Sequence, residues 1–261
     1  MVKIVEWTRD QALIALNLYC QLPFGRLHYR NPAIIEVAGR LGRTPGSLAM
    51  KLTNLASLDP VIVESGRRGL SGASALDRSV WQEFRADPDK VGYESQVLMD
   101  ALIGGTQSLV ELSSDALEPE VAPSYRAETT TATVAVRVKQ SFFRRAVLSS
   151  YDSTCCMSGI KYPSLLVASH IVPWSKDEHN RLNPANGLCL SALHDKAFDR
   201  GLITVTPDLK IRVSPALRDV ETAPMALSYL LGLDGVAIRL PKKFAPDREF
   251  LRYHSEVLFV S

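Results

Sequence analysis

The sequence of 261 residues lacks the long apolar runs that membrane proteins carry. No stretch of about 18 consecutive apolar residues occurs, and the N-terminus has no basic segment followed by an apolar one. Neither a membrane span nor a secretory signal is therefore indicated, and we expect a cytoplasmic protein. Cysteine is also scarce, and its four positions follow no framework spacing, which argues against structural disulfides: Cys20, Cys155, Cys156 and Cys189.

A strong excess of charge of either sign is absent too. The formal net charge of +2 is too small to identify a nucleic-acid binder by itself. The charge is unevenly distributed, however. Residues 132–201 carry 9 Lys and Arg against 5 Asp and Glu, whereas residues 101–131 carry 1 against 5. The positive excess therefore falls on the middle of the chain, directly after an acidic stretch.

Composition and periodicity predict an α+β protein with three parts. Residues 1–102 read as a mainly helical domain of helix-turn-helix or winged-helix type. Residues 103–133 are rich in Gly, Ser, Thr, Pro and acidic side chains, which predicts a linker. Residues 134–261 alternate short strands with helices and read as a second domain.

The helical part has clear start signals. Thr8 and Gln11 fit a capping box, and Asn31-Pro32 and Thr44-Pro45 each place Pro at a first helical position. Two helices joined by a tight turn at Gly42 are typical of a helix-turn-helix. The following run VIVE reads as extended, and Arg67-Arg68 after it suggest a basic wing.

The second helix of this pair is a candidate DNA-reading helix. Its apolar residues fall on one face, while Ser47, Lys51 and Asn54 share the opposite face, and Arg43 precedes the helix. Hydroxyl, ammonium and amide groups suit contacts with phosphates and base edges. An ordinary amphipathic helix in a three-helix core explains the same pattern equally well.

The second domain is expected to begin with a strand over 134–139, followed by a helix carrying Arg144 and Arg145. These arginines are candidates for contacts with a phosphate backbone, although a solvated helix face would look the same. Two further strand-like runs, LLVASHIV and NGLCLS, flank a polar loop, and ALHDKAF reads as a helix closed by Gly201. LITV and LKIRV then predict a hairpin, 236–240 a further strand, and PDREFLRYHSEVLF a last helix.

The strand, loop, strand, helix segment gathers the polar residues that suit phosphodiester cleavage. His170 ends the first strand, Asn186 begins the second, and His194 opens the helix. An imidazole titrates near neutral pH, so one histidine can take a proton from water while another, neutral, holds a metal ion.

These three residues match the first His, the Asn and the last His of the HNH endonucleases, which the sequence resembles. The phrases SHIVPW, NPANGLCLS and LHDKAFDRGLI are similar to a subgroup of restriction-type enzymes, and LGRTPGSLAMKLTNLASLDP is similar to their N-terminal module. The resemblance implies a ββα-metal finger that cuts DNA with Mg²⁺ or Mn²⁺. It implies His170 as general base and His194 as a metal ligand, with Asn186 either fixing the loop or reaching the metal.

Two departures from the family pattern matter. The residue before the base is often Asp or His and binds the ion, but here it is Ser169, a poor ligand. Asp199 is our candidate for the missing carboxylate and Asp195 is the next, although Asp199 equally suits pairing with Arg200. Many HNH proteins also carry CxxC pairs that hold zinc. This sequence has none, so we expect no structural zinc.

Two functions remain open at this point. The first is a metal-dependent DNA endonuclease with a role in restriction or defence. The second is a DNA-binding regulator whose HNH-like domain no longer cuts, which Ser169 would permit. A single finger cuts one strand, so double-strand cleavage would require a homodimer.

Overall fold

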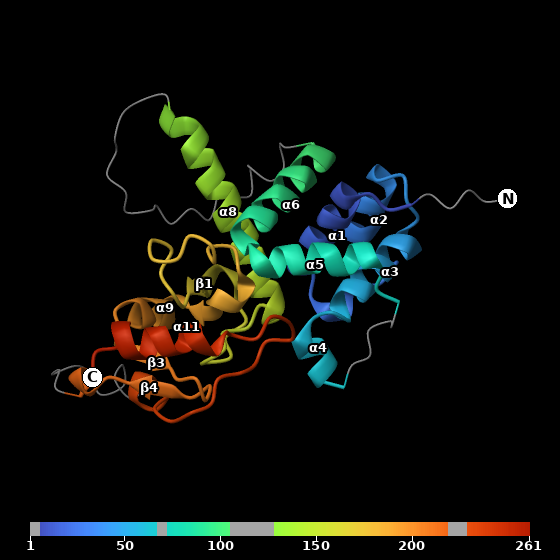
Figure 1. The fold of residues 1–261 in the computed structure, drawn as a ribbon. Helices are drawn as coiled ribbons and strands as arrows, with labels where there is room; N and C mark the ends of the chain where they lie inside the picture. Colours follow the sequence, from blue (N-terminus) through green and yellow to red (C-terminus); the bar gives the residue numbers. More distant parts are fainter. Residues whose placement is uncertain (1–5, 67–71, 105–127, 219–228) are drawn as a thin grey trace. The chain divides into compact units, whose positions relative to one another are not determined.

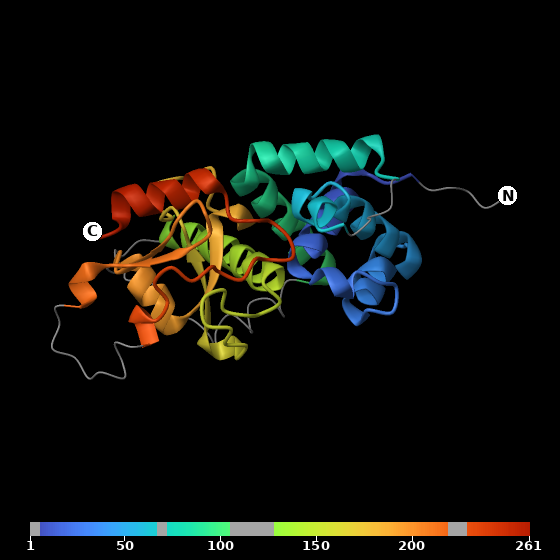
Figure 2. The same cartoon turned by 90° about the horizontal axis from the view of Figure 1, so that it is seen from below.

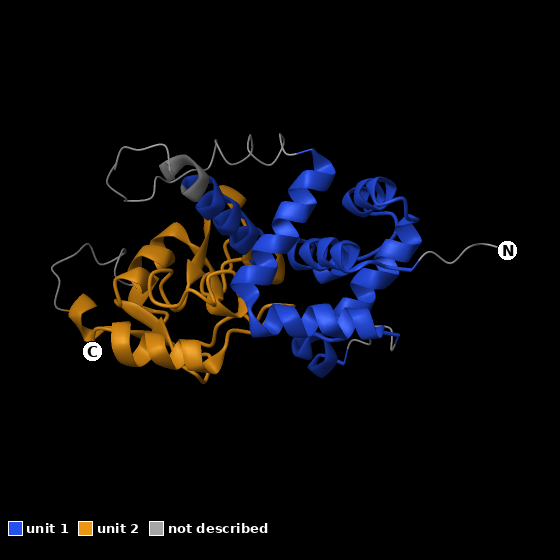
Figure 3. Cartoon of the chain, turned by 45° about the horizontal axis from the view of Figure 1, so that its top comes forward, with its two compact units in different colours: residues 1–146 blue, residues 147–261 orange. Residues whose placement is uncertain are grey.

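The computed structural model describes residues 6–66, 72–104, 128–218 and 229–261. It divides the chain into two compact units, Met1–Ala146 and Val147–Ser261, which Figure 3 colours separately. The boundary falls inside one long helix, α8 (Glu128–Ser150). Each unit is treated below by itself. No helix in the described ranges has the length and apolar character needed to cross a membrane.

The first unit is helical wherever it is described (Figure 1). α1 is the central element, because α3, α5 and α6 all pack against it. Its start is the expected capping box, with Thr8 accepting from the Gln11 N–H and Gln11 reaching back to the Thr8 N–H. The helices are α1 (Arg9–Gln21), η1 (Phe24–Arg26), α2 (Pro32–Arg40), α3 (Pro45–Ala56), α4 (Pro60–Glu64), α5 (Ala75–Ala86), α6 (Pro88–Ile103) and the first part of α8.

The expected helix-turn-helix elements are present as α2 and α3. Asn31 and Thr44 cap them with their side chains, and in both a proline follows the cap, as the sequence predicted. Gly42 in the turn has φ of 65°, a left-handed conformation that glycine adopts without strain. Local signals therefore set the ends of both helices.

Two expected extended segments are wrong. The VIVE run forms helix α4, because Asp59 caps it and Pro60 occupies its first position. The expected strand over 134–139 lies inside α8. Packing decides the second case, since Phe142 of this helix makes an edge contact with Phe84 and Lys139 forms an ion pair with Asp89. The expected wing arginines and residues 105–127 of the expected linker lie outside the described residues.

The second unit contains the expected strand, loop, strand, helix order. β1 (Leu166–His170) pairs antiparallel with β2 (Gly187–Ser191), so His170 lies opposite Gly187. α9 (Ala192–Asp199) follows directly and packs against both strands. The expected hairpin is also present, as β3 (Ile203–Val205) and β4 (Ile211–Val213). Figure 2 shows these strands from below.

The remaining elements of this unit are short. The expected strand over 236–240 is reduced to a single bridge between Lys210 and Ala237. The expected last helix is present, and it changes from α-helix to a π-helical turn at His254. That histidine is structural, since it stacks on Phe198 at 3.6 Å between ring centroids and its Nδ1 lies 2.8 Å from Thr204 Oγ1. The short elements are η2 (Pro163–Leu165), η3 (Pro184–Asn186), η4 (Pro215–Leu217), α11 (Arg248–Tyr253) and η5 (His254–Leu258).

Gly201 ends α9 as the sequence predicted, and its conformation also fixes the C-terminal segment. Its φ is 67°, and a Cβ at this position would lie 2.1 Å from the carbonyl oxygen of Leu258. The N–H of Val260 donates to the Gly201 carbonyl at 3.0 Å. No side chain fits between these two backbone segments.

Gly201→Ala should therefore lower the free energy of unfolding by about 2–4 kcal/mol, through strain and displacement of the C-terminal segment. Gly235→Ala is the matched control, because Gly235 also has positive φ, 78°, but open space around it. That control should cost only about 1 kcal/mol. Urea denaturation measures both, and equal losses would contradict the close approach.

Candidate active site

His170 lies at the end of β1 in the orientation of a proton acceptor. Its Nε2 lies 2.9 Å from the carbonyl oxygen of Arg181, so Nε2 carries the proton and the lone pair resides on Nδ1. The Trp174 ring makes an edge contact at 5.5 Å between centroids. Desolvation lowers the pKa of His170 to about 4, which leaves it neutral at physiological pH. An anionic phosphate beside the ring would raise that pKa.

Asn186 holds the loop that follows His170. Its side chain is buried, and Oδ1 accepts from the Val172 N–H at 2.8 Å while Nδ2 donates to the carbonyls of Val172 and Asn180. The Ile171 N–H donates to the Asn186 carbonyl at 2.9 Å. Of the two roles that the sequence left open, this geometry favours fixing the loop, because the amide is engaged with backbone groups.

The same loop is ordered by its own polar residues. Asn180 donates to the Asp177 carboxylate at 2.8 Å and accepts from Asn183 Nδ2 at 2.8 Å. Arg181 Nε donates to the Trp174 carbonyl at 2.9 Å, and its guanidinium lies over the Trp174 ring. Sequence reasoning missed Arg181, because it acts on His170 through a backbone carbonyl, which leaves no trace in residue type.

His194 is fully buried in the first turn of α9. Its Nδ1 lies 2.9 Å from Ser191 Oγ and 3.5 Å from Cys155 Sγ, and its ring stacks on Tyr229. Its Nε2 is buried without a hydrogen-bond partner in the described part of the chain.

Cys155 is a partner that the sequence did not suggest. Its sulfur accepts from the Ser191 and Ser158 N–H groups, at 3.2 and 3.4 Å. Burial opposes the charged thiolate, but hydrogen bonds from His194 and Ser158 outweigh it and lower the pKa of Cys155 to about 6. The sulfur therefore connects the turn after Cys155 to the start of α9.

A pair of carboxylates lies on α9. Asp195 and Asp199 are one helical turn apart, so their side chains share a face. Burial and the charge of Asp199 raise the pKa of Asp195 to about 6, and burial raises the pKa of Asp199. The buried Ser169 hydroxyl lowers the Asp195 pKa slightly, although no hydrogen bond of normal geometry joins them. Asp195 therefore lies near Ser169, the residue of β1 that precedes His170.

The predicted metal ligands are His194 and Asp199, with Asp195 as the next candidate. Within the described ranges, no group of three or more His, Cys, Asp or Glu side chains converges to hold an ion. Asp195 and Asp199 nevertheless provide two oxygen donors whose mutual repulsion a cation would relieve. His194 is engaged with Ser191 and Cys155 through Nδ1 only, and its Nε2 has no partner among the described residues.

The predicted DNA contacts of the first unit have internal partners. Lys51 Nζ forms a buried ion pair with Asp77 at 2.7 Å. Arg43 donates to Gln11 Oε1 at 2.7 Å and lies over the Trp7 ring. Ser47 and Asn54 are half-buried and line a pocket with Trp7 and Lys51. Three of the four predicted residues, Ser47, Lys51 and Asn54, therefore line one hollow.

The predicted contacts on α8 are likewise half-buried. Arg145 donates to Ser141 Oγ at 2.8 Å, one turn earlier on the same helix. Arg144 has contacts of its own within the protein. For both arginines, contact with a phosphate backbone stays a prediction.

Asn186→Ala should lower the free energy of unfolding by about 2–3 kcal/mol, because the buried N–H and carbonyl of Val172 lose their partners. The comparison is Asn183→Ala, since Asn183 is only half-buried and belongs to the same loop. That variant should cost about 1 kcal/mol. Urea denaturation together with hydrogen exchange at the Val172 amide measures the difference, and an unchanged exchange rate in Asn186→Ala would refute the loop role.

Comparison with known proteins bears on the same segment. Residues 155–206 match the family model of the HNH endonucleases, and this range includes His170, Asn186, His194 and the carboxylate pair. No curated protein matches the chain. The second unit therefore contains an HNH endonuclease domain, a nuclease module that acts on nucleic acid.

Proposed function

We propose that the protein is a metal-dependent DNA endonuclease in which His170 is the general base. The observation that carries this proposal is the neutral His170, held through Nε2 by the Arg181 carbonyl, together with two carboxylates one turn apart on α9, the first of which lies near Ser169 of β1. Hydrolysis of a phosphodiester needs a deprotonated water in line with the leaving oxygen. The Nδ1 atom of His170 would take that proton.

The residues present fit a hard divalent cation, Mg²⁺ or Mn²⁺. Asp195 and Asp199 would hold it, with the Ser169 hydroxyl as a third oxygen donor. When bound, such an ion supplies positive charge where the phosphoryl group becomes more negative. Two protein carboxylates suffice for Mg²⁺, which commonly keeps water and takes phosphate oxygens as further ligands.

The sequence assigned the ion to His194 and Asp199. We keep Asp199 and add Asp195 as its partner, because the two carboxylates share one face of α9. His194 Nδ1 is directed at Ser191 and Cys155, so only its Nε2 could serve as a further ligand. In this proposal His194 holds the turn from β2 into α9, and so orients the helix that carries both carboxylates. Asn186 fixes the loop so that the Arg181 carbonyl meets His170.

DNA as the substrate is supported by the first unit, where α2 and α3 form the expected helix-turn-helix order. A restriction or defence role is supported by the phrases that resemble such enzymes. A non-cutting regulator is the second candidate, and Ser169 favours it, because a hydroxyl is a weaker metal ligand than the Asp or His it replaces. Cleavage of both strands would require two sites, so we also propose a homodimer for that activity.

Nicking of supercoiled plasmid with Mg²⁺ or Mn²⁺ tests the enzyme directly. His170→Ala should reduce nicking by about 100-fold or more, because proton transfer by a positioned base contributes that much. His179→Ala is the matched control, since His179 is exposed in the same loop, and it should nick like the parent. Equal activity of the parent and His170→Ala would eliminate the nuclease proposal and leave the regulator.

The metal assignment has a test that does not depend on activity. Millimolar Mn²⁺ should raise the melting temperature of the parent by about 4 °C, and Asp195→Asn or Asp199→Asn should abolish this shift. Asp208→Asn, which alters an exposed carboxylate in the β3–β4 turn, should retain it. A shift that survives both variants but disappears in His194→Ala would place the ion on the histidine.

The same assay should depend on pH in one direction. A cation competes with the proton that Asp195 binds below its pKa of about 6. The apparent affinity for Mn²⁺ should therefore be constant above about pH 7 and fall about tenfold for each unit below pH 6. Titration of the thermal shift at pH 5, 6 and 7 measures this dependence, and an affinity that rises on acidification would contradict the carboxylate site.

A further inference from the structure

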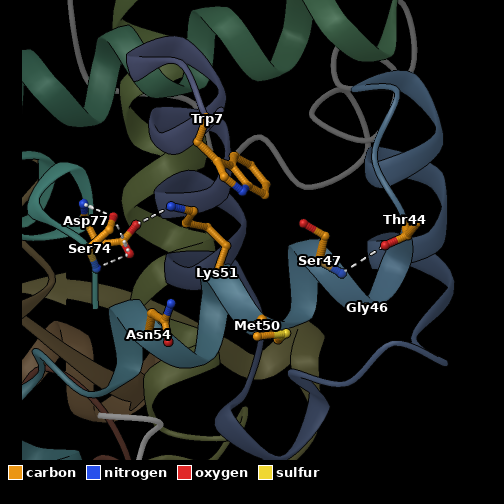
Figure 4. Close-up of a pocket in the computed structure, with 9 residues that line it drawn as sticks. All are labelled: Trp7, Thr44, Gly46, Ser47, Met50, Lys51, Asn54, Ser74 and Asp77. Carbon is orange, nitrogen blue, oxygen red and sulfur yellow. Dashed lines mark hydrogen bonds and ion pairs between the residues drawn. The ribbon is translucent and has the colours of Figure 1, made fainter. Parts of the chain in front are cut away.

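The polar face of α3 is recessed, which is unusual for a helix expected to enter a DNA groove. Ser47, Lys51 and Asn54 line one side of a pocket of about 530 Å³, and Trp7 lines the other. Figure 4 shows the Trp7 ring directed toward α3 across this space. The complete lining is Trp7, Thr44, Gly46, Ser47, Met50, Lys51, Asn54, Ser74 and Asp77. An open hollow of this volume can accept an inserted group, whereas a groove edge requires a projecting helix.

The pocket has no spare charge. Lys51 and Asp77 neutralise each other in a buried ion pair at 2.7 Å. Asp77 also accepts from the Ser74 N–H and hydroxyl. The cations of Arg43 and Lys51 lie 4.5 and 4.8 Å from the Trp7 ring centroid and fix the ring in place. Within the described lining the cation is Lys51, which Asp77 already neutralises, so these residues fit an uncharged ligand better than a phosphate.

The lining does offer hydrogen bonds and apolar contact. The Asn54 side-chain amide is half-buried and makes no hydrogen bond with any described residue, so it can both donate and accept. The Ser47 hydroxyl adds a second polar group, while Trp7 and Met50 provide apolar surface. Gly46 has no side chain to narrow the space at the start of α3. An amide beside an aromatic ring suits a flat heteroaromatic molecule with donors and acceptors on its edge.

We infer that this pocket binds a single unpaired nucleobase of DNA. The inference rests on the proposed function, which makes DNA the substrate, and it specifies what the first unit recognises. The base would lie between Trp7 and α3, with its edge against the Asn54 amide. Lys51 and Asp77 would form the neutral floor of the site and would not contact the phosphate backbone.

Fluorescence anisotropy with the full-length protein tests this inference, in a His170→Ala background so that the probe is not cut. The probes are three labelled duplexes of one sequence. The first is fully paired, the second has one base opposite an abasic site, and the third has abasic sites at both of these positions. An unpaired base costs least to extrude. The duplex that contains it should therefore bind about tenfold more tightly than the other two, the range expected for one base in an aromatic site.

Two substitutions locate the effect. Asn54→Ala should remove the preference, so that the three duplexes bind with equal affinity. Thr53→Ala is its matched control, because Thr53 lies next in α3 and bonds to the Ala49 carbonyl outside the pocket, and it should keep the preference. Met50→Trp retains Asn54 but fills the pocket from an exposed position. This variant should also lose the preference.

The outcomes separate this inference from the proposal on which it rests. Equal binding of the three duplexes would refute nucleobase binding in this pocket. So would a preference that persists in both Asn54→Ala and Met50→Trp. In either case, nicking of plasmid by the parent protein would still support the proposed nuclease. Absence of nicking together with absence of DNA binding overturns both.

Discussion

The hydrogen bonds that Asn186 makes to the backbone of Val172 are the constraint on which the site depends. The two-stranded sheet ends where His170 faces Gly187. One step further, the Ile171 N–H still donates to the Asn186 carbonyl, and the Asn186 side chain then pairs with both backbone groups of Val172. The side-chain amide thus makes the two hydrogen bonds that the backbone of a paired strand residue would make. Because short two-stranded sheets are marginal alone, these extra hydrogen bonds fix the end of the sheet at which His170 lies.

Helix periodicity accounts for the different surroundings of neighbouring residues on α9. Successive side chains point about 100° apart around a helix, so His194 and Asp195 cannot face the same neighbours. His194 is directed toward Cys155 and Ser191, whereas Asp195 interacts with Ser169 on β1 and shares its face with Asp199. Cys155 holds the start of the helix through the Ser191 N–H. A buried sulfur and imidazole therefore set the direction in which the carboxylates point.

The sequence predicted those parts that depend on short-range signals. Caps, prolines at first helical positions and the glycine at the end of α9 all marked the element ends correctly. The runs at 61–64 and 134–139 misled because β-branched residues favour strands only when packing agrees, and here a cap and the Phe84–Phe142 contact favoured helix. The Arg181 carbonyl could not be foreseen, since every residue type offers that group.

Lys51 shows why a charge pattern alone could not define the surface of α3. Its partner Asp77 lies 26 residues away and also belongs to the capping box of α5. One carboxylate therefore both supports the start of a helix and neutralises the lysine of the expected reading face. Phosphate neutralisation dominates nonspecific affinity, and residues 1–100 carry only 12 Lys and Arg against 11 Asp and Glu. The positive excess lies in 132–201, the segment that contains the nuclease residues. The positive excess therefore coincides with the part of the chain that contains the HNH match, whereas on α3 the Lys51 cation is already neutralised by Asp77.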